Sequence, residues 1–194
     1  MENVLIESLD PSVANLLTEN STELDGNGKP KTYYLKGRFI QGDIRNHNGR
    51  IYPASEIRSA VSQINERLQK GFSVTGEIDH PEGMGINLDR VSHMITEMYT
   101  QGSDGFGTIK IIETVPSGQL IKGLLDAGVK LGVSSRGAGD VGPSGYVSNF
   151  FIKTIDIVSD PSGPTCLPEA IRESKQYKLI DYLSEEATID DRAK

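Results

Sequence analysis

The sequence is short of the residues that several classes of protein require. Its 194 residues include one cysteine, Cys166, and no tryptophan. A single cysteine excludes a disulfide framework and a cysteine-based zinc site, and it fits a reducing compartment. No apolar run approaches the roughly 20 residues that cross a bilayer, and the first residues lack the basic and apolar regions of a secretory signal. We therefore expect a soluble, intracellular protein.

Positive charge is also scarce. Twenty Lys and Arg residues face 27 Asp and Glu residues, which gives a formal net charge of −7. An acidic chain is poorly suited to binding a phosphate backbone through its overall charge. No basic stripe with interleaved aromatic residues is evident either. We expect protein or peptide partners, with no direct nucleic acid and no membrane.

The polar, turn-rich ends of the chain differ from its middle, which has the hydrophobic patterns of strands and helices. Three parts are predicted: a flexible N-terminal arm over residues 1–30, a compact domain over 31–167, and a C-terminal helix with an acidic tail over 168–194.

Hydrophobic periodicity within the middle part predicts more strands than helices. One helix is expected where Ile57, Ala60, Val61 and Ile64 share a face, and a second over residues 120–129 with Ser117 as its N-cap. Strands are expected over residues 33–40, 72–79, 91–99, 106–115, 132–135 and 146–158. The hairpin-like spacing of neighbouring strands favours an α+β fold, in which a largely antiparallel, barrel-like sheet carries two or three packed helices.

Only three histidines are available for acid–base chemistry. His80 ends a predicted strand and is followed by Pro81, so the backbone would hold its imidazole in place, as a general base requires. A hydrogen-bonded structural histidine is the alternative. His93 lies within a strand and is expected to be structural, and His47 lies in a polar loop and is expected to be solvated.

Two adjacent serines, Ser134 and Ser135, lie in the glycine-flanked segment that ends with Arg136 and Gly137. A serine at such a strand exit can act as a nucleophile, and the N–H groups after it can stabilise an oxyanion. Arg136 occupies the place of the second glycine in a Gly-x-Ser-x-Gly elbow, so the segment is not that motif. A plain Ser/Gly turn is the alternative.

One carboxylate interrupts an otherwise apolar strand. Asp156 would need a partner if it is buried, because desolvating an unpaired carboxylate is costly. A histidine is one such partner. Asp160, which precedes Pro161, is more typical of a turn cap.

Four segments together resemble a known family. They are Asn48-Gly49-Arg50-Ile51-Tyr52-Pro53, Gly76-Glu77-Ile78-Asp79-His80-Pro81, Gly132-Val133-Ser134-Ser135-Arg136-Gly137 and Asp156-Ile157-Val158-Ser159-Asp160-Pro161-Ser162. In order and spacing they resemble the prohead maturation proteases of T-even-type tailed bacteriophages. The resemblance implies a serine endopeptidase, made as a zymogen, that works in the host cytoplasm inside the assembling prohead. Its substrates would be scaffold or core proteins, the major capsid protein and itself; it would form a homo-oligomer and use no metal or cofactor.

The same resemblance implies roles for individual residues. His80 would be the base, Ser134 the nucleophile and Asp156 the third member of the triad, with Asp160 as the alternative. Ser135, Arg136 and Gly137 would form the oxyanion and substrate-binding segment. The family's relation to herpesvirus assembly proteases implies a β-barrel surrounded by helices. Those enzymes use a second histidine as the third member, but no histidine follows Ser134 here, which favours an acidic residue.

The family's preferred site resembles Leu/Ile-x-Glu, cut after the glutamate. Glu7 and Glu173 complete such triplets near the two ends of the chain and are the candidate self-cleavage sites. Recognition of a glutamate before the cut requires a basic pocket, for which Arg136, Arg50 and Lys153 are the possible donors.

Two other functions compete with this interpretation. A metal-dependent hydrolase could use Glu77, Asp79, His80 and His93 as ligands, but their spacing matches no standard zinc signature. A non-enzymatic phage head or tube assembly subunit could use the same sheet architecture to pair strand edges.

Overall fold

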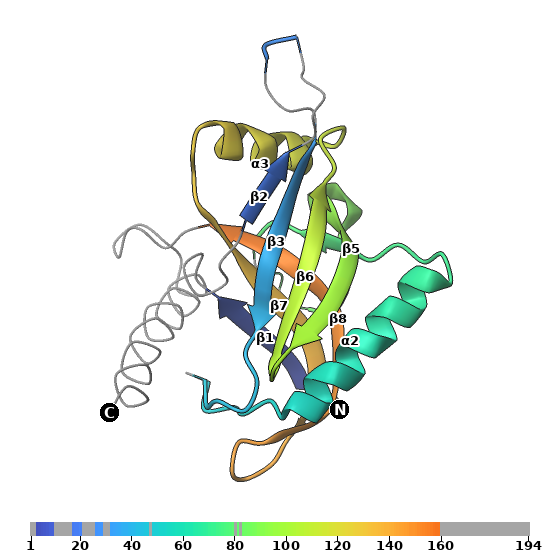
Figure 1. Cartoon of the computed structure of the whole chain (residues 1–194), viewed down its shortest axis with the longest axis vertical. Helices are drawn as coiled ribbons and strands as arrows, with labels where there is room; N and C mark the ends of the chain where they lie inside the picture. The colour runs from blue at the N-terminus through green and yellow to red at the C-terminus, as the bar shows by residue number, and fades with distance from the viewer. Residues whose placement is uncertain are drawn as a thin grey trace.

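Antiparallel strands and two α-helices make up the described part of the chain, as Figure 1 shows. The computed structural model describes residues 3–9, 17–20, 26–28, 32–46, 48–79, 81 and 83–159. In chain order the elements are β1 (Asn3–Leu9), β2 (Leu17–Asn20), β3 (Tyr33–Ile40), α2 (Ala54–Gln69), β4 (Thr75–Glu77), the 3-10 turn η1 (Leu88–Arg90), β5 (Val91–Gln101), β6 (Asp104–Ile111), α3 (Pro116–Asp126), β7 (Leu131–Val141) and β8 (Val147–Ser159).

The strands pair in two sheets. One has the order β1-β7-β8 and the other the order β2-β3-β6-β5-β4, and every pairing between named strands is antiparallel. An isolated parallel bridge between Ile78 and Ile157 joins β8 to the residue after β4. The predicted α+β class, the antiparallel pairing and two helices are thus confirmed. Closure into a barrel is not shown, and the likeness to herpesvirus assembly proteases stays a prediction.

Parts of the predicted N-terminal arm are strands. β1 pairs with β7, and β2 pairs with β3. These pairings attach both stretches to the sheets, so they differ from a free arm. The boundaries at residues 30 and 167 stay predictions, and the predicted C-terminal helix and tail lie outside the described residues.

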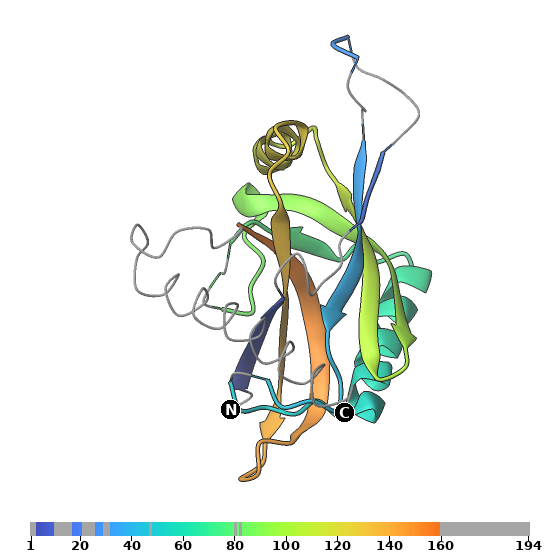
Figure 2. The same ribbon diagram turned by 60° about the vertical axis from the view of Figure 1, so that its left-hand side comes forward.

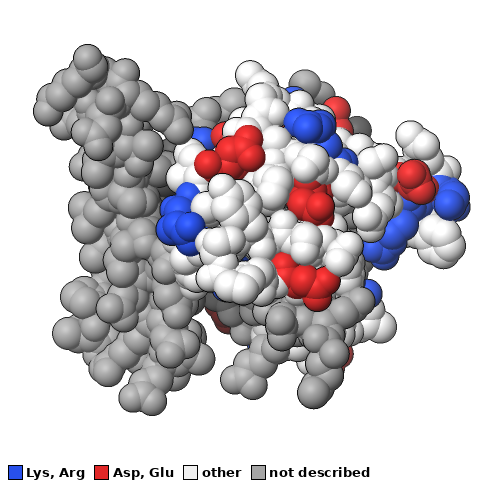
Figure 3. Space-filling model, turned by 90° about the horizontal axis from the view of Figure 1, so that it is seen from below, with Lys and Arg blue, Asp and Glu red and all other residues white. Residues whose placement is uncertain are grey.

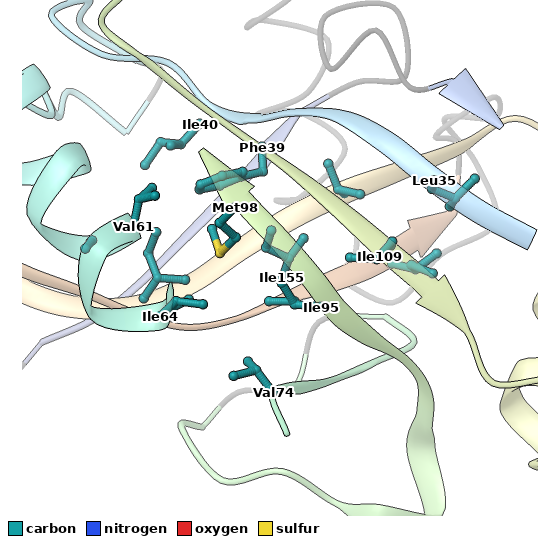
Figure 4. Packing of buried hydrophobic residues seen from close by; sticks show 14 of the residues in the cluster. Leu35, Phe39, Ile40, Val61, Ile64, Val74, Ile95, Met98, Ile109 and Ile155 are labelled. Atoms are coloured by element: carbon teal, nitrogen blue, oxygen red, sulfur yellow. The ribbon is translucent and has the colours of Figure 1, made fainter. Parts of the chain in front are cut away.

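The helix α2 has the predicted buried face of Ile57, Ala60, Val61 and Ile64. It packs against β8 and β5, and Figures 1 and 2 show it along one side of the sheets. In Figure 4, Val61 and Ile64 point toward Met98 and Ile155 of the strands beneath them. This packing removes the apolar face of the helix from water and holds it against both sheets.

The start of α3 differs from the prediction. The N-cap is Val115, with extended backbone, and Pro116 takes the first position of the helix. A proline is favoured there because its fixed φ suits the helix and its missing N–H would have no helical partner. Ser117 therefore lies inside the first turn, and its hydroxyl donates to the Asp89 carbonyl at 3.4 Å.

His93 is a core residue with both ring nitrogens bonded. It is fully buried, its Nε2 lies 2.7 Å from the carbonyl oxygen of Ile155, and its Nδ1 lies 2.8 Å from the Ser92 hydroxyl. Burial lowers the pKa of His93 to about 4. The imidazole is therefore neutral at pH 7, and it joins β5 to β8.

A glycine is required where β4 crosses this histidine. A Cβ at Gly76 would lie 2.1 Å from His93 Nε2 and 2.2 Å from the carbonyl oxygen of Ile155. Backbone and a buried ring cannot give way at that distance. The glycine of the Gly-Glu-Ile-Asp-His-Pro segment is thus explained by packing.

We expect Gly76→Ala to lower the free energy of unfolding by about 2 kcal/mol or more, because the added methyl group overpacks this crossing. Urea unfolding followed by circular dichroism measures the change. Gly123→Ala in α3 is the matched control, since a Cβ there meets nothing within 4 Å. The control should stabilise the helix by about 0.5–1 kcal/mol. Equal stabilities for the two variants would contradict the packing argument.

Candidate active site

Ser134 lies at the centre of the sheet β1-β7-β8. It is directly opposite Asp156 in the pairing of β7 with β8, so the two side chains share a face. Ser134 is fully buried, and its Oγ has no hydrogen-bond partner among the described residues. A buried hydroxyl without a partner is uncommon and requires an explanation.

Arg136, two residues further along β7, holds a buried charge cluster together. Its Nη2 donates to Glu77 at 2.6 Å and to Asp156 at 3.0 Å, and its Nη1 donates to the carbonyls of Gly83 and Gly85 at 2.8 and 2.9 Å. Its Nε lies 2.9 Å from Asp156 Oδ2, an ion-pair contact that does not have hydrogen-bond geometry. The Arg136 guanidinium therefore lies inside the protein between two carboxylates, and it fixes the loop at residues 83–85.

Asp156 has two neighbours in this cluster. The Glu77 backbone N–H donates to its Oδ1 at 3.0 Å, beside the Arg136 contacts. Burial raises the pKa of Asp156 to about 6, although the Glu77 N–H and the Arg136 charge oppose the shift. The contacts of Asp156 thus run to β4 and β7. His80 and Asp160 lie outside the described residues, so the pairing of Asp156 with His80 stays a prediction.

The residue before His80 is anchored beside Asp156. The Asp79 N–H donates to the Ile157 carbonyl at 2.8 Å, and Asp79 has a φ of 64°. Asp is among the few residue types that tolerate this left-handed conformation. Asp79 therefore has left-handed backbone and is anchored to Ile157, one residue along β8 from Asp156.

β1 pairs with the edge of β7 that β8 does not occupy, and it lies opposite both serines. Glu7 is opposite Ser135 and Ser8 is opposite Ser134. The Ser135 hydroxyl donates to the Glu7 carbonyl oxygen at 3.4 Å. The peptide bond between Glu7 and Ser8 consequently lies across from the bond that joins the two serines.

The segment predicted for oxyanion stabilisation is paired on both sides. Ser135, Arg136 and Gly137 each have a register partner in β1 and another in β8. Their backbone groups therefore lie within the sheet while β1 is in place. Whether they stabilise an oxyanion stays a prediction.

The carboxylate of Glu7 is buried in a polar pocket. Tyr52 Oη donates to Oε1 at 2.7 Å, Asn48 Nδ2 donates to Oε2 at 2.9 Å, and Arg50 Nε lies 3.2 Å from Oε1. Burial raises the pKa of Glu7, while the Arg50 charge and the Tyr52 and Asn48 hydrogen bonds oppose the increase. Of the three expected glutamate-binding cations, Arg50 is thus the one that contacts Glu7.

Sequence reasoning missed three of these roles. Asn48 and Tyr52 lie in one of the four resembling segments, but the sequence analysis assigns them no function. Glu77 was considered only as a metal ligand. Glu77, Arg136 and Asp156 are charged residues within strands. Because buried charges need partners, this pattern could have indicated a buried ion cluster.

The alternative metal site does not assemble within the described part of the chain. No three His, Cys, Asp or Glu side chains there are grouped closely enough to hold an ion. Glu77 contacts Arg136, and both ring nitrogens of His93 are occupied. The fourth suggested ligand, His80, lies outside the described residues.

The surface charge and the helices are relevant to the binding of nucleic acid and membranes. Figure 3 shows basic and acidic side chains interspersed on the lower face, with uncharged surface between them. Within the described residues no helix is long and apolar enough to span a membrane. Independence from nucleic acid stays an expectation.

The fold and the site define an α+β protein in which the chain's own first strand lies along a sheet edge that carries two buried serines. A family model described as prohead core protein serine protease matches residues 8–176 of the chain. The prohead core protein protease of Enterobacteria phage T4 is 32% identical over 152 residues, which cover 73% of this chain and 71% of that protein. A solved structure of the bacteriophage T4 capsid assembly protease, gp21, matches with a TM-score of 0.68 and 26% identity, and covers 81% of this chain and 98% of that one.

The chain belongs to the prohead core protein protease family. It is therefore a peptidase of phage prohead maturation that acts inside the prohead, on prohead proteins.

Proposed function

We propose that the chain is a serine endopeptidase that cleaves scaffold or core proteins, the major capsid protein and itself, after the glutamate of Leu/Ile-x-Glu sites. One observation carries the proposal. The bond after Glu7, in the triplet Leu5-Ile6-Glu7, lies across from Ser134 and Ser135. The chain with that bond intact is then the precursor in the host cytoplasm. The active peptidase is a homo-oligomer.

The chemistry follows from acyl transfer. The Ser134 Oγ attacks the scissile carbonyl carbon, while His80 accepts the hydroxyl proton. Backbone N–H groups of residues 135–137 then stabilise the oxyanion, and the contact of the Ser135 hydroxyl with the Glu7 carbonyl oxygen at 3.4 Å supports a contribution from that hydroxyl. The C–N bond then breaks, the leaving amine takes the proton from His80, and water hydrolyses the acyl-enzyme. No metal or cofactor takes part.

Asp156 is the proposed third member, with Asp160 as the alternative. Its contact with the Glu77 N–H ties β8 to β4, the strand that leads to His80. Asp156 would thereby orient the imidazole and hold the strand that carries it.

Self-cleavage tests this function. We expect prolonged incubation of the full-length chain to produce new N-termini at Ser8 and Ser174, detected by intact-mass and peptide mass spectrometry. Addition of EDTA should leave the rate unchanged, because the chemistry needs no metal ion. A matched chain with Ser134→Ala should keep both bonds intact. Unprocessed ends under conditions in which scaffold protein is cut would contradict the self-cleavage sites, and loss of activity in EDTA would contradict the serine mechanism.

A further inference from the structure

Glu7 is unusual because a glutamate side chain near the end of a chain is normally solvated. Here it is only 6% exposed. Its two carboxylate oxygens are contacted by the side chains of Asn48, Arg50 and Tyr52, which belong to one short segment of the chain. Such a set of donors forms a binding site for a carboxylate.

The pocket is built independently of β1. The Asn46 side chain accepts from the Arg50 N–H at 2.9 Å, and the N–H of Ile51 donates to the Gly145 carbonyl at 2.8 Å. The Val147 N–H donates to the Ile51 carbonyl at 2.9 Å. The Gly49 N–H also donates to the Asn46 carbonyl oxygen at 2.9 Å, so Asn48 lies in a turn that leads into Ile51 and Tyr52, and bonds outside β1 hold this segment in place. The Tyr52 ring is fixed by an edge contact with Phe150, at 4.8 Å between centroids.

β1 occupies the position of an added strand. It pairs with β7 at the end of the order β1-β7-β8, while β8 takes the other edge of β7. Main-chain pairing of this kind accepts many sequences, and pockets for individual side chains supply the specificity. The pocket around Glu7 is such a position, and the bond after that residue faces the two serines.

We propose that Asn48, Arg50 and Tyr52 form the subsite that recognises a glutamate side chain in the substrate, and that β1 is its first occupant. This assignment rests on the proposed peptidase function and deepens it. Substrate strands then replace β1 on β7 and place their own glutamate in the pocket.

The contacts favour glutamate over its close analogues. Arg50 Nε–H and Asn48 Nδ2–H can only donate, so they require acceptor oxygens. A glutamine would present an amide group in place of one oxygen and would lose the attraction of the Arg50 charge. An aspartate is shorter by one carbon–carbon bond, about 1.5 Å, and would not reach all three donors.

A binding experiment tests the subsite apart from the chemistry. The probe is a fluorescent peptide with the β1 sequence NVLIESL, and the protein is the full-length chain with Ser134→Ala and Glu7→Ala. We expect the peptide to bind about tenfold or more tightly than its Glu-to-Gln analogue, because hydrogen bonds to charged groups are worth about that factor. It should bind at least about tenfold more weakly when Glu7 is present to compete.

Substitutions in the pocket then test the residues. Arg50→Gln and Tyr52→Phe should each reduce the preference for Glu over Gln by about tenfold. Lys153→Gln is the matched control among the expected cations, and it should leave the preference unchanged. Urea unfolding of each variant checks that it is folded, and Tyr52→Phe keeps the ring contact with Phe150.

The outcomes separate the subsite from the proposed function. If folded Arg50→Gln and Tyr52→Phe chains still prefer Glu as the wild type does, the subsite assignment is wrong even if cleavage continues. If the preference depends on Arg50 and Tyr52 but chains that retain Ser134 never cut the peptide, the subsite stands and the proposed cleavage after glutamate by Ser134 fails.

Discussion

Ser134→Ala should abolish proteolysis without weakening the fold. The loss in kcat/KM should be at least about three orders of magnitude, since the nucleophile of a serine peptidase acts as a unit with its base. The Ser134 hydroxyl is buried and makes no hydrogen bond among the described residues. Removing it therefore costs no bond to a described residue and should change the free energy of unfolding by less than about 0.5 kcal/mol. Peptide cleavage kinetics and urea unfolding measure the two effects.

The neighbouring serine is the matched control. Ser135→Ala removes the contact between its hydroxyl and the Glu7 carbonyl oxygen, so we expect a smaller loss, about 10- to 100-fold. His80→Ala should match Ser134→Ala. If Ser135→Ala abolished activity and Ser134→Ala did not, the nucleophile would be Ser135. If no variant reduced cleavage, the nucleophile and the base would lie elsewhere in the chain.

Arg136→Met should cause the largest loss of stability. The substitution leaves Glu77 and Asp156 buried without their shared cation. Removing one partner of a buried ion pair typically costs about 3–5 kcal/mol. Arg38→Met is the matched control, because Arg38 pairs with Asp104 where both side chains are partly exposed. Its cost should be at most about 1 kcal/mol.

The cost of Arg136→Met should depend on pH. In the wild type the pKa of Asp156 is raised to about 6 from its ordinary value of 3.8. The folded chain therefore holds a proton that the unfolded chain releases, and this contribution to stability declines as the pH rises from about 4 to about 6. Arg136 lowers the pKa of Asp156, so its removal raises that pKa further. The destabilisation should be greater at pH 8 than at pH 4, and a difference that is constant with pH would contradict this account.

The titration of His93 should not obscure that difference. Its pKa is lowered to about 4, so its contribution to stability is complete above pH 6.5 and is lost as the pH falls toward 4. This dependence has the opposite sign to that of Asp156. Because both the wild type and Arg136→Met retain His93, its contribution cancels in the comparison.

Local sequence patterns were sufficient to predict most of the helices and strands. The strand over residues 33–40 and the buried face of α2 appear as predicted, because alternation and helical spacing are local properties of the sequence. The predicted strand at 132–135 is only part of β7, which runs from Leu131 to Val141. Its glycines obscured the strand pattern, yet a Cβ at Gly137 would lie 2.2 Å from the Phe151 carbonyl oxygen.

Contacts between distant parts of the chain could not be predicted in this way. The triplet ending at Glu7 suggested a cleavage site, but nothing local to it indicated that β1 pairs with β7 or that the Glu7 carboxylate reaches Tyr52. Asp156 was expected to need a partner, and the described cation beside it is Arg136, which had been considered only for substrate binding. Both contacts depend on register between strands, which a single sequence does not display.

Because β1 belongs to the same chain as β7, a β1 strand that leaves β7 would rebind as a tethered ligand. A short tether gives such a segment an effective concentration of about a millimolar. A free substrate protein can displace β1 only where that protein reaches a similar concentration, as in a closed shell filled with core protein. Scission of the tethered bond, by contrast, is a first-order event that dilution does not slow. Confinement would therefore favour cleavage of other proteins, whereas dilution would leave the rate of self-cleavage unchanged.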